Sequence, residues 1–370
     1  MIQCYDNCFE CKACVQICPQ NCIKFNNGVL NIDEKSCIRC GLCDSVCQIQ
    51  HPVFYEKLGK VYAAVGISED TLNMSSSGGM ANILYQHILE KKGIIFGAKY
   101  ATDLEPNMSY TDDKKNLNDF LRSKYCFSNI GDSYKKCKEF CDNNKTVLYI
   151  GLPCQIAGLK LYLKKEYKNL FLVDILCHGA PHYSIFKNHI AYLESKQKKK
   201  IIDYQFRNKE FDRYGPYHYT ITYANKQKKS GSALWDAYYN AFLKSNIFRE
   251  ACYSCVYARK ERISDITLGD FWNAKENIEQ LYEKKYISSI IINTVKGEKL
   301  LNECKDKIHL YPSTYEMLEK STHAICQPAK KTHNTDIERL KEYKYYFKWA
   351  SRYENSLCVI LRKIKNMIAR

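Results

Sequence analysis

The chain has 370 residues, 45% of them hydrophobic, which allows two or three domains with cores of their own and excludes a small scaffold held together by disulfides. It begins with cysteines rather than with a basic and apolar leader, and its apolar runs are shorter than the roughly 18 residues of a membrane span, so we expect a cytoplasmic protein. The formal net charge of +16 favours an acidic partner, such as a phosphorylated cofactor or an acidic electron carrier, and the scattered lysines do not indicate nucleic-acid binding.

The 20 cysteines indicate metal or redox sites, because disulfides are rare in a reducing compartment. Four open the sequence as Cys-x2-Cys-x2-Cys-x3-Cys-Pro, and the same cysteine spacing returns 29 residues later. A [4Fe-4S] cluster needs one thiolate for each iron, and in two-cluster ferredoxins the fourth cysteine of each set binds the other cluster. We therefore predict two [4Fe-4S] clusters, the first held by Cys8, Cys11, Cys14 and Cys47 and the second by Cys37, Cys40, Cys43 and Cys18.

Zinc is the alternative metal for these cysteines, but it takes four ligands, usually as two Cys-x2-Cys pairs, and a doubled set of eight fits it poorly. Residues 1–55 resemble bacterial-type dicluster ferredoxins, and we place a ferredoxin-type domain at 1–58. One departure is Gln48, which stands where the first set has Pro19 and is expected to change a turn. Cys22 lies off the pattern, and we expect it to be a small buried thiol.

From residue 59 onward, helical and strand-like segments alternate. Helical spacing covers 79–92 and the segment after 151, and short apolar or alternating runs predict strands at 93–100, 146–151, 169–176, 201–206, 217–224, 264–272 and 287–293. This alternation predicts an α/β domain with a mixed sheet, so the whole chain, with its ferredoxin fold first, is of the α+β class. We place the second domain at 59–345, docked directly on the first because no low-complexity linker separates them, and a basic helical tail at 346–370.

Four more cysteines lie in loops of this second domain. Cys154 and Cys177 follow predicted strands, where open α/β sheets carry their sites, and Cys154 also lies near a helix N-terminus, which is expected to lower its pKa. With the pair Cys252 and Cys255 they suggest a further site, for which a third cubane, zinc, a redox-active pair and buried thiols all stay open. The stretch SSSGGM at 75–80 offers either backbone N–H groups for a phosphate or an ordinary helix start.

Seven motifs of this domain, in their order along the chain, resemble the coenzyme F-420 hydrogenase/dehydrogenase beta-subunit family: SSSGGM (75–80), SKYCFS (123–128), GLPCQIAGLK (151–160), DILCHGAP (174–181), FRNK (206–209), CYSC (252–255) and SDITLGDFW (264–272). The resemblance covers about residues 60–345, and relatives with a fused dicluster ferredoxin include proteins of bacterial polysaccharide gene clusters. It implies a flavoprotein whose FAD exchanges two electrons with a substrate, often a deazaflavin, and single electrons with iron–sulfur clusters. It also implies a third [4Fe-4S] cluster, held by Cys154, Cys177, Cys252 and Cys255.

The same resemblance implies which residues face the flavin or its substrate. The implied cofactor-binding residues are Ser76, Ser77, Gly78, Gly79, Ser123, Lys124, Tyr125 and Gly269, and the candidate catalytic residues are His178 and Asp270. Lys124 either neutralises a reduced flavin or binds a phosphate, and Asp270 is either an acid/base group or a ligand of the ribityl chain. His178 titrates in the range of a proton donor, but we favour a hydrogen bond that holds the cysteine loop.

Together these features predict an iron–sulfur flavoprotein oxidoreductase. It would pass electrons between a one-electron donor such as ferredoxin, [4Fe-4S] clusters and FAD, and so reduce or oxidise a deazaflavin-like or other small organic substrate. The alternative is a polyferredoxin-like electron-transfer subunit without a substrate of its own, and a nucleic-acid-binding regulator ranks last because no basic recognition helix is visible. The C-terminal tail has the composition of a basic amphipathic helix at a membrane surface, although a packed terminal helix is the simpler expectation.

Overall fold

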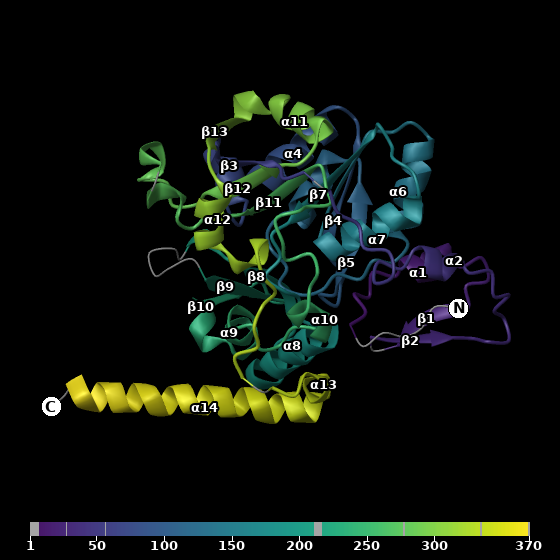
Figure 1. The fold of residues 1–370 in the computed structure, drawn as a ribbon. Helices are drawn as coiled ribbons and strands as arrows, with labels where there is room; N and C mark the ends of the chain where they lie inside the picture. The colour runs from purple at the N-terminus through teal and green to yellow at the C-terminus, as the bar shows by residue number, and fades with distance from the viewer. Residues whose placement is uncertain are drawn as a thin grey trace.

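The computed structural model describes residues 7–26, 28–55, 57–210, 217–276, 278–333 and 335–368. A small N-terminal segment lies beside a larger body built on an eight-stranded mixed sheet and a separate three-stranded sheet (Figure 1). Helices and strands both contribute to the cores, and parallel and antiparallel strands share the large sheet. The α+β class and the mixed sheet are therefore confirmed.

The N-terminal segment is a short hairpin flanked by two cysteine-bearing loops. Strand β1 (Ile23–Asn26) pairs antiparallel with β2 (Val29–Ile32), and Gly28 takes a φ of 87° at the turn between them. The single-turn helices α1 (Ala13–Ile17) and α2 (Leu42–Ser45) lie within the two cysteine repeats and contact each other. The two repeats therefore form one unit.

The large sheet has parallel strands at its centre and antiparallel strands toward its edges. Its order is β13-β3-β12-β11-β7-β6-β4-β5, and the pairs β11/β7, β7/β6 and β6/β4 are parallel. Central parallel strands are buried on both faces, which explains why they appear in the sequence as nearly continuous apolar runs. The strands are β3 (Lys60–Gly66), β4 (Ile94–Tyr100), β5 (Pro106–Thr111), β6 (Val147–Gly151), β7 (Leu170–Ile175), β11 (Ile266–Asp270), β12 (Ser288–Ile292) and β13 (Ile308–Pro312).

Neighbouring side chains of β6 enter different cores, because successive residues of a strand point to opposite faces. Val147 packs with helices α6 (Ser133–Asp142) and α7 (Pro153–Leu163), and Leu148 packs with α4 (Met80–Glu90) on the other face. The remaining elements of this body are α3 (Glu69–Asn73), α5 (Leu117–Phe120), α11 (Val295–Asn302), α12 (Tyr315–Ser321), and the 3-10 turns η1 (Lys114–Asn116), η4 (Ala274–Glu276), η5 (Glu279–Leu281), η6 (Lys305–Lys307) and η7 (His323–Ile325). The two faces of the sheet are thus covered by different helices.

The smaller sheet is antiparallel, in the order β10-β9-β8, and an aromatic core lies against it. Its central strand β9 was expected to be an edge or antiparallel strand, and it is antiparallel on both sides. The elements of this layer are β8 (Ile201–Phe206), β9 (His218–Tyr223), β10 (Lys228–Ser232), α8 (Tyr183–Gln197), η3 (Ala233–Trp235), α9 (Ala237–Leu243), α10 (Glu250–Tyr253), α13 (Ile337–Leu340) and α14 (Tyr343–Ile368).

A buried carboxylate organises this aromatic core. Asp236 is 2% exposed, and its Oδ2 accepts hydrogen bonds from the Tyr204 hydroxyl at 2.9 Å and from His189 Nε2 at 2.8 Å. Its Oδ1 accepts from the backbone N–H of Tyr239 at 2.7 Å, which caps α9. The Tyr346 hydroxyl lies 3.0 Å from His189 Nδ1 and so connects α14 to the same network.

The N-terminal segment docks directly on α6 and α7, as the lack of a linker predicted (Figure 1). Gln16 Oε1 accepts hydrogen bonds from the backbone N–H groups of Tyr134 and Lys135, both at 3.1 Å, and so caps α6 from the other segment. A Cβ on Gly158 of α7 would lie 2.8 Å from Cys11 Cβ, so only glycine permits this approach. The segment therefore shares one hydrophobic core with the large sheet.

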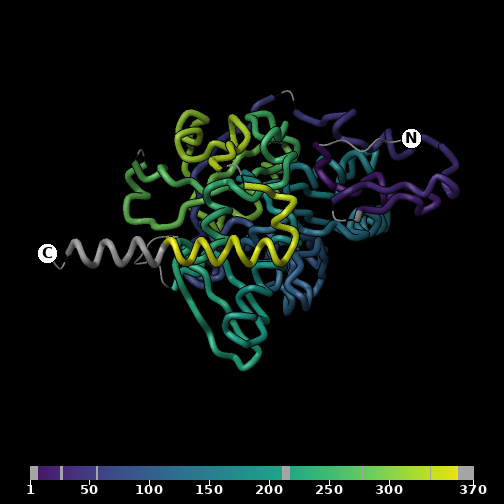
Figure 2. Tube along the Cα trace, turned by 90° about the horizontal axis from the view of Figure 1, so that it is seen from below, coloured from purple at the N-terminus to yellow at the C-terminus, as the bar shows by residue number. Residues whose placement is uncertain are grey.

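The predicted strands and helices of the second domain are all present, with small differences at their ends. Strands β3, β5, β10 and β13 were not predicted. The helix in the predicted tail begins at Tyr343, and Figure 2 shows α14 and the N-terminal segment on different sides of the molecule. Side chains beyond residue 356 lie outside the described residues, so the amphipathic character of the tail stays a prediction. Among the described helices, none has the length and apolar character needed to cross a membrane.

Candidate functional site

The structure divides the eight motif cysteines of the N-terminal segment into two groups. The thiols of Cys8, Cys11, Cys14 and Cys47 interact electrostatically with one another and form the first group. Burial, reinforced by these neighbours, raises the pKa of Cys8 to about 12. Cys47 comes from the second repeat, so this group has the crossed composition expected for a dicluster ferredoxin.

The second group lines a hollow of about 380 Å³ formed by Cys18, Cys37, Cys40, Cys43 and Cys22. Cys22 is buried, as expected, but its Sγ lies 3.4 Å from the Sγ of Cys18. The only sign of this in the sequence is its position four residues after Cys18. Cys40 is exposed, whereas the first group contains the buried Cys14, so the second group is the more accessible of the two.

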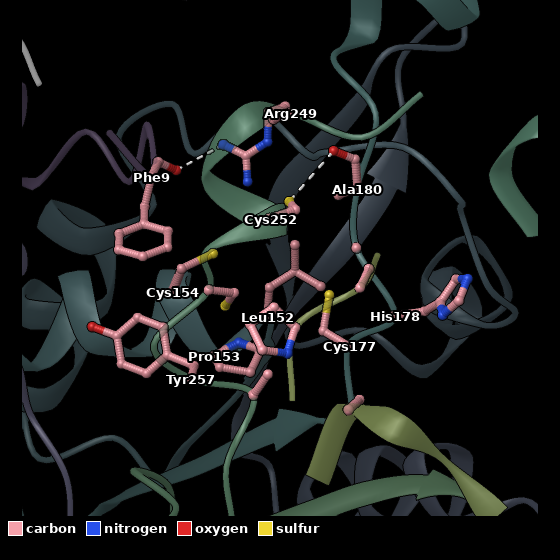
Figure 3. Close-up of a pocket in the computed structure, with 16 residues that line it drawn as sticks. Phe9, Leu152, Pro153, Cys154, Cys177, His178, Ala180, Arg249, Cys252 and Tyr257 are labelled. Atoms are coloured by element: carbon pink, nitrogen blue, oxygen red, sulfur yellow. Dashed lines mark hydrogen bonds between the residues drawn. The ribbon is translucent and has the colours of Figure 1, made fainter. Parts of the chain in front are cut away.

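A third group of cysteines lies where parallel strands of the large sheet end. Cys154 follows β6 at the start of α7, Cys177 follows β7, and Cys252 and Cys255 lie in and after α10. All four line one hollow of about 480 Å³, and Figure 3 shows Cys154, Cys177 and Cys252 around the same space. The other lining residues are mostly apolar, with the cation of Arg249 among them. We call this hollow the cysteine pocket.

Burial makes the thiols of the cysteine pocket weak acids. It raises the pKa of Cys177 to about 12 and holds that of Cys154 well above its ordinary value. The expected lowering of the Cys154 pKa by the helix N-terminus is therefore wrong, because this side chain is 7% exposed and burial outweighs the helix end. Arg249 acts in the opposite direction on both thiols, since its charge favours thiolate.

The donor set of the cysteine pocket fits a [4Fe-4S] cluster. Such a cluster takes one thiolate for each iron, and four cysteines surround the pocket. Within the described part of the chain, no three His, Cys, Asp or Glu side chains converge on one metal-ion position. A four-iron cluster does not require that convergence, because its ligands are spread over four irons. The assignment of a third cluster to these residues stays a prediction, which the chemistry of the pocket supports.

The first cysteine group and the cysteine pocket adjoin each other. Phe9, in the loop of the first group, is 5% exposed and lines the cysteine pocket. Gln48 donates from Nε2 to the carbonyl oxygen of Cys154 at 2.9 Å. Arg249 Nη1 donates to the carbonyl oxygen of Phe9 at 2.8 Å, as Figure 3 shows, and lies 3.5 Å from Glu10 Oε1. Gln48 therefore joins two segments, and the change of turn expected at this position stays a prediction.

His178 is held at both of its ring nitrogens. Its Nδ1 lies 2.7 Å from His323 Nε2, and its Nε2 lies 3.2 Å from the Ser245 hydroxyl. Burial, together with the neighbouring His323, lowers the pKa of His178 to about 4, so the ring is neutral near pH 7. These contacts favour the role of holding the cysteine loop over that of a proton donor.

Two of the segments expected at a flavin lie in contact. The Ser76 hydroxyl accepts a hydrogen bond from the backbone N–H of Ser123 at 2.8 Å. The Ser77 hydroxyl donates to the carbonyl oxygen of Ile287 at 3.0 Å, just before β12. The structure thus brings the 75–80 loop beside the segment that starts at Ser123 and beside the beginning of β12 in the large sheet.

The glycines of the 75–80 loop have structural reasons to be glycine. A Cβ on Gly78 would lie 2.6 Å from the carbonyl oxygen of Ala64, and the Gly78 N–H already donates to the Ser288 hydroxyl at 3.0 Å. Gly79 takes a φ of 94° directly before α4, where a side chain would be strained. These contacts favour the ordinary helix start, and one N–H expected to face a phosphate is used within the protein.

Lys124 and Tyr125 are half-buried in a largely aromatic environment. Lys124 Nζ donates to the carbonyl oxygen of Leu121 at 2.9 Å, and burial lowers the pKa of Lys124 to about 8. The Tyr125 ring stacks on that of Phe242, with their centroids 4.3 Å apart. The expected roles of Lys124 toward a flavin or a phosphate stay predictions, because its ammonium group donates its hydrogen bond to the backbone of its own loop.

Gly269 and Asp270 end strand β11. A Cβ on Gly269 would lie 2.8 Å from the Ser289 hydroxyl, so this glycine also allows close packing. Asp270 Oδ2 accepts a hydrogen bond in an ion pair with Nη1 of Arg207, a residue whose side chain is only 3% exposed. No role was assigned to Arg207 from the sequence. The signal that could have identified it as a site residue was its place in the FRNK motif (206–209).

The remaining described cysteines lie apart from the three groups. Cys126, Cys137, Cys141 and Cys304 are buried, and Cys326 is exposed. Cys137 and Cys141 are hydrogen-bonded to each other on α6. Cys4 and the side chain of Cys358 lie outside the described residues. Idle or buried thiols, the simplest expectation for these residues, stay the simplest description.

Comparison with known proteins relates both parts of the chain to redox proteins. Residues 144–316 match the family model for the C-terminal region of the coenzyme F420 hydrogenase/dehydrogenase beta subunit. The coenzyme F420-dependent sulfite reductase of Methanocaldococcus jannaschii is 26% identical, over 94% of this chain and 53% of its own length. A ferredoxin of Streptomyces griseus is 40% identical over 45 residues, which are 12% of this chain and 42% of that protein. The chain therefore spans about half of the length of these curated relatives.

A more distant likeness is to a solved structure. A chain of the F420-reducing [NiFe] hydrogenase complex from Methanosarcina barkeri aligns with a TM-score of 0.45 and 13% identity, and the alignment covers 85% of this chain and 96% of that chain.

Proposed function

We propose that this chain, a coenzyme F420 hydrogenase/dehydrogenase beta-subunit-like protein with a ferredoxin-like N-terminal segment, is an iron–sulfur flavoprotein oxidoreductase. It passes electrons between a one-electron carrier such as ferredoxin and a small organic substrate, for which a deazaflavin is the first compound to test. The observation that carries the proposal is the adjacency of the cysteine groups. A group with an exposed thiol and a more buried group share one segment, and the buried group adjoins a pocket with four further cysteines.

The proposed cofactors divide the chemistry between them. Iron–sulfur clusters exchange single electrons and a flavin exchanges one or two, so the combination suits a carrier of single electrons and a two-electron substrate. Cys8, Cys11, Cys14 and Cys47 would hold one cluster, Cys18, Cys37, Cys40 and Cys43 the second, and Cys154, Cys177, Cys252 and Cys255 the third. We also propose the domain boundaries expected from the sequence: a ferredoxin-type domain at 1–58, a flavin and iron–sulfur domain at 59–345, and a helical tail at 346–370.

The residues between the groups hold them in place and keep water out. Phe9 fills one side of the cysteine pocket, and Gln48 ties the first group to the start of α7. The buried cation of Arg249 would offset the negative charge of the thiolates in the pocket. Electron transfer needs short, fixed separations, so these contacts support transfer between the N-terminal segment and the large sheet.

The flavin assignment rests on the segments that the fold places together. Ser76 contacts the segment that begins at Ser123, and Ser77 lines one hollow with Asp270. These positions come from three separate stretches of the chain and meet near the ends of β3 and β11. Open α/β sheets place their ligands at the carboxyl ends of strands, which supports a cofactor at this edge.

The test is a count of iron and of extractable flavin in protein purified without oxygen. We expect about twelve irons and one FAD per chain, at four irons for each cluster. Cys255→Ser should lose about four irons, whereas Cys326→Ser, which changes an exposed cysteine outside the three groups, should lose none. About eight irons and no flavin would refute the proposal and leave an electron-transfer subunit without its own substrate.

A further inference from the structure

A basic hollow lies where the large sheet and the smaller sheet meet. It encloses about 390 Å³ and includes Arg207, directly after β8, and Asp270, the last residue of β11. Lys275, Lys284 and Lys285 also line it, so four cations face one carboxylate. Because Asp270 neutralises Arg207, the lysines leave a surplus of positive charge at the hollow.

Arg207 is buried with part of its hydrogen-bonding capacity unused. Its Nη1 is paired with Asp270, whereas Nε and Nη2 make no hydrogen bond of normal geometry with the described residues, and the Tyr125 hydroxyl is their neighbour. Buried donors without a partner are rare and costly, so this edge of the guanidinium is suited to a ligand. Nε and Nη2 present two parallel N–H groups, the arrangement that binds a phosphate or a carboxylate at two oxygens.

The surroundings hold the Arg207 side chain in position. Its guanidinium carbon lies 4.9 Å from the ring centroid of Trp272 and 5.8 Å from that of Tyr217. The backbone of Arg207 takes a φ of 55°, which residues other than glycine adopt rarely and which often occurs at functional sites. The planar group is therefore fixed by Asp270 on one edge and by aromatic rings on its faces.

Two of the lysines of the hollow are free to bind a ligand. Lys275 and Lys284 are exposed, and the described part of the chain provides no partner for either ammonium group. Lys209, nearby in the sequence, is different, because its Nζ donates to the carbonyl oxygens of Leu72 and Ser77. An anion with more than one negative charge matches this surplus better than a single carboxylate does.

We propose that the basic hollow binds the phosphate or pyrophosphate group of a phosphorylated ligand, through the unpaired edge of Arg207 and the ammonium groups of Lys275 and Lys284. The identity of the ligand rests on the proposed function: it is either the pyrophosphate of FAD or a phosphate of the organic substrate. Asp270 is then a positioning residue, which orients Arg207 rather than exchanging a proton with the substrate.

Inorganic pyrophosphate is the probe, and the full-length protein depleted of flavin is the sample. We expect pyrophosphate to raise the unfolding temperature of this protein, because a ligand that binds only the folded state stabilises it. The double variant Lys275→Gln/Lys284→Gln should bind pyrophosphate at least about tenfold more weakly, because each substitution removes a charge-assisted hydrogen bond. The control Lys299→Gln/Lys305→Gln removes the same charge from exposed lysines elsewhere and should keep the affinity of the natural protein.

A second variant tests the fork of Arg207. Arg207→Lys keeps the positive charge but loses the two parallel donors, so it should also weaken pyrophosphate binding while Asp270 keeps an ionic partner. If this variant does not fold, the lysine pair still decides the question, because both lysines are exposed. Equal pyrophosphate affinity in the two lysine double variants, or no binding to the natural protein, would overturn the proposal.

The two sources of the phosphate are distinguished by flavin titration. If the hollow holds the pyrophosphate of FAD, inorganic pyrophosphate will compete with FAD, and Lys275→Gln/Lys284→Gln will lower the flavin content. If it holds a substrate phosphate, the flavin content will be unchanged and the flavin-loaded protein will still bind pyrophosphate. A protein with about twelve irons and one FAD that fails to bind pyrophosphate in either form would overturn this inference and leave the proposed function intact.

Discussion

Replacing Gly158 by alanine tests how tightly the N-terminal segment docks on the large body. In a helix, this change normally stabilises a protein by about 0.5–1 kcal/mol, because glycine loses more conformational freedom on folding. Here the added Cβ would lie 2.8 Å from Cys11 Cβ, 2.9 Å from the Tyr134 hydroxyl and 3.0 Å from Cys11 Sγ. Non-bonded carbon atoms prefer a separation of about 3.5–4.0 Å, so α7 and the Cys11 loop must move apart by about 1 Å.

Overpacking of this kind costs about 1–3 kcal/mol, which outweighs the gain in helix propensity and leaves a net loss of about 1 kcal/mol. Cys11 is a candidate cluster ligand, so Gly158→Ala should also lower the iron content. The measurements are thermal unfolding, iron per chain, and hydrogen exchange of the backbone in α1, which should become faster.

The control is Ser195→Ala, an alanine substitution at an exposed position of α8 that has no contact with the N-terminal segment. It should be neutral or slightly stabilising, with normal iron content. If Gly158→Ala is more stable than the natural protein and hydrogen exchange in α1 is unchanged, α7 and the Cys11 loop do not make the close contact described here.

Two further substitutions test buried charges. Arg249→Met removes the donor to the Phe9 carbonyl and leaves Glu10 without this ion pair, so we expect a loss of about 3–5 kcal/mol in unfolding free energy and less iron, with partial recovery in Arg249→Lys. Asp236→Asn tests acid stability. Burial by itself raises the pKa of Asp236, but the charge of His189 and the hydrogen bonds from His189, Tyr239 and Tyr204 have a larger, opposite effect. The pKa of Asp236 is therefore lowered overall. A lowered carboxyl pKa stabilises the fold above the unfolded value of about 3.9, and this stability is lost as the pH falls toward the folded value.

The outcome for Asp236 is read from unfolding temperatures measured between about pH 3 and pH 6, which span the unfolded carboxyl pKa. The unfolding temperature of the natural protein should fall more steeply toward pH 3 than that of Asp236→Asn. The variant should be less stable at neutral pH, but its unfolding temperature should depend less on pH. Parallel profiles would exclude Asp236 as a source of acid sensitivity. For Arg249, an unchanged iron content in the methionine variant would show that the cysteine pocket does not depend on its charge.

Local sequence patterns predicted much of the secondary structure. Strands β6 and β7 are nearly continuous apolar runs, β4 begins with one and β12 ends with three isoleucines, because these segments are buried on both faces of the sheet. Such runs can be recognised without knowing their neighbours. Of the strands that were not predicted, β3 is an apolar run inside the large sheet that the sequence reading missed, whereas β10 lies at an edge and has a polar sequence. β10 is the polar stretch KKSGS, and its strand conformation depends on pairing with β9. Edge strands of this kind are set by tertiary contacts.

The sequence by itself determined the candidate ligands and their two N-terminal groupings, because cluster chemistry imposes a short, repeated spacing that is visible along the chain. It also indicated that Cys154 and Cys177 follow strands, since a strand and the loop after it are neighbours in sequence. Only the tertiary structure showed that these residues meet Cys252 and Cys255, because parallel strands bring together loops that are far apart along the chain.

Contacts across the docking surface depended entirely on the tertiary structure. In the sequence, Gln48 was notable only because it stands where the first repeat has a proline. Only the fold shows that its side-chain amide donates a hydrogen bond to the carbonyl oxygen of Cys154. Burial likewise reversed the pKa shift expected for Cys154, because desolvation depends on all the segments that surround a thiol. The unpaired edge of Arg207 has the same origin: spacing shows which side chains are present, but only packing decides which donors keep a partner.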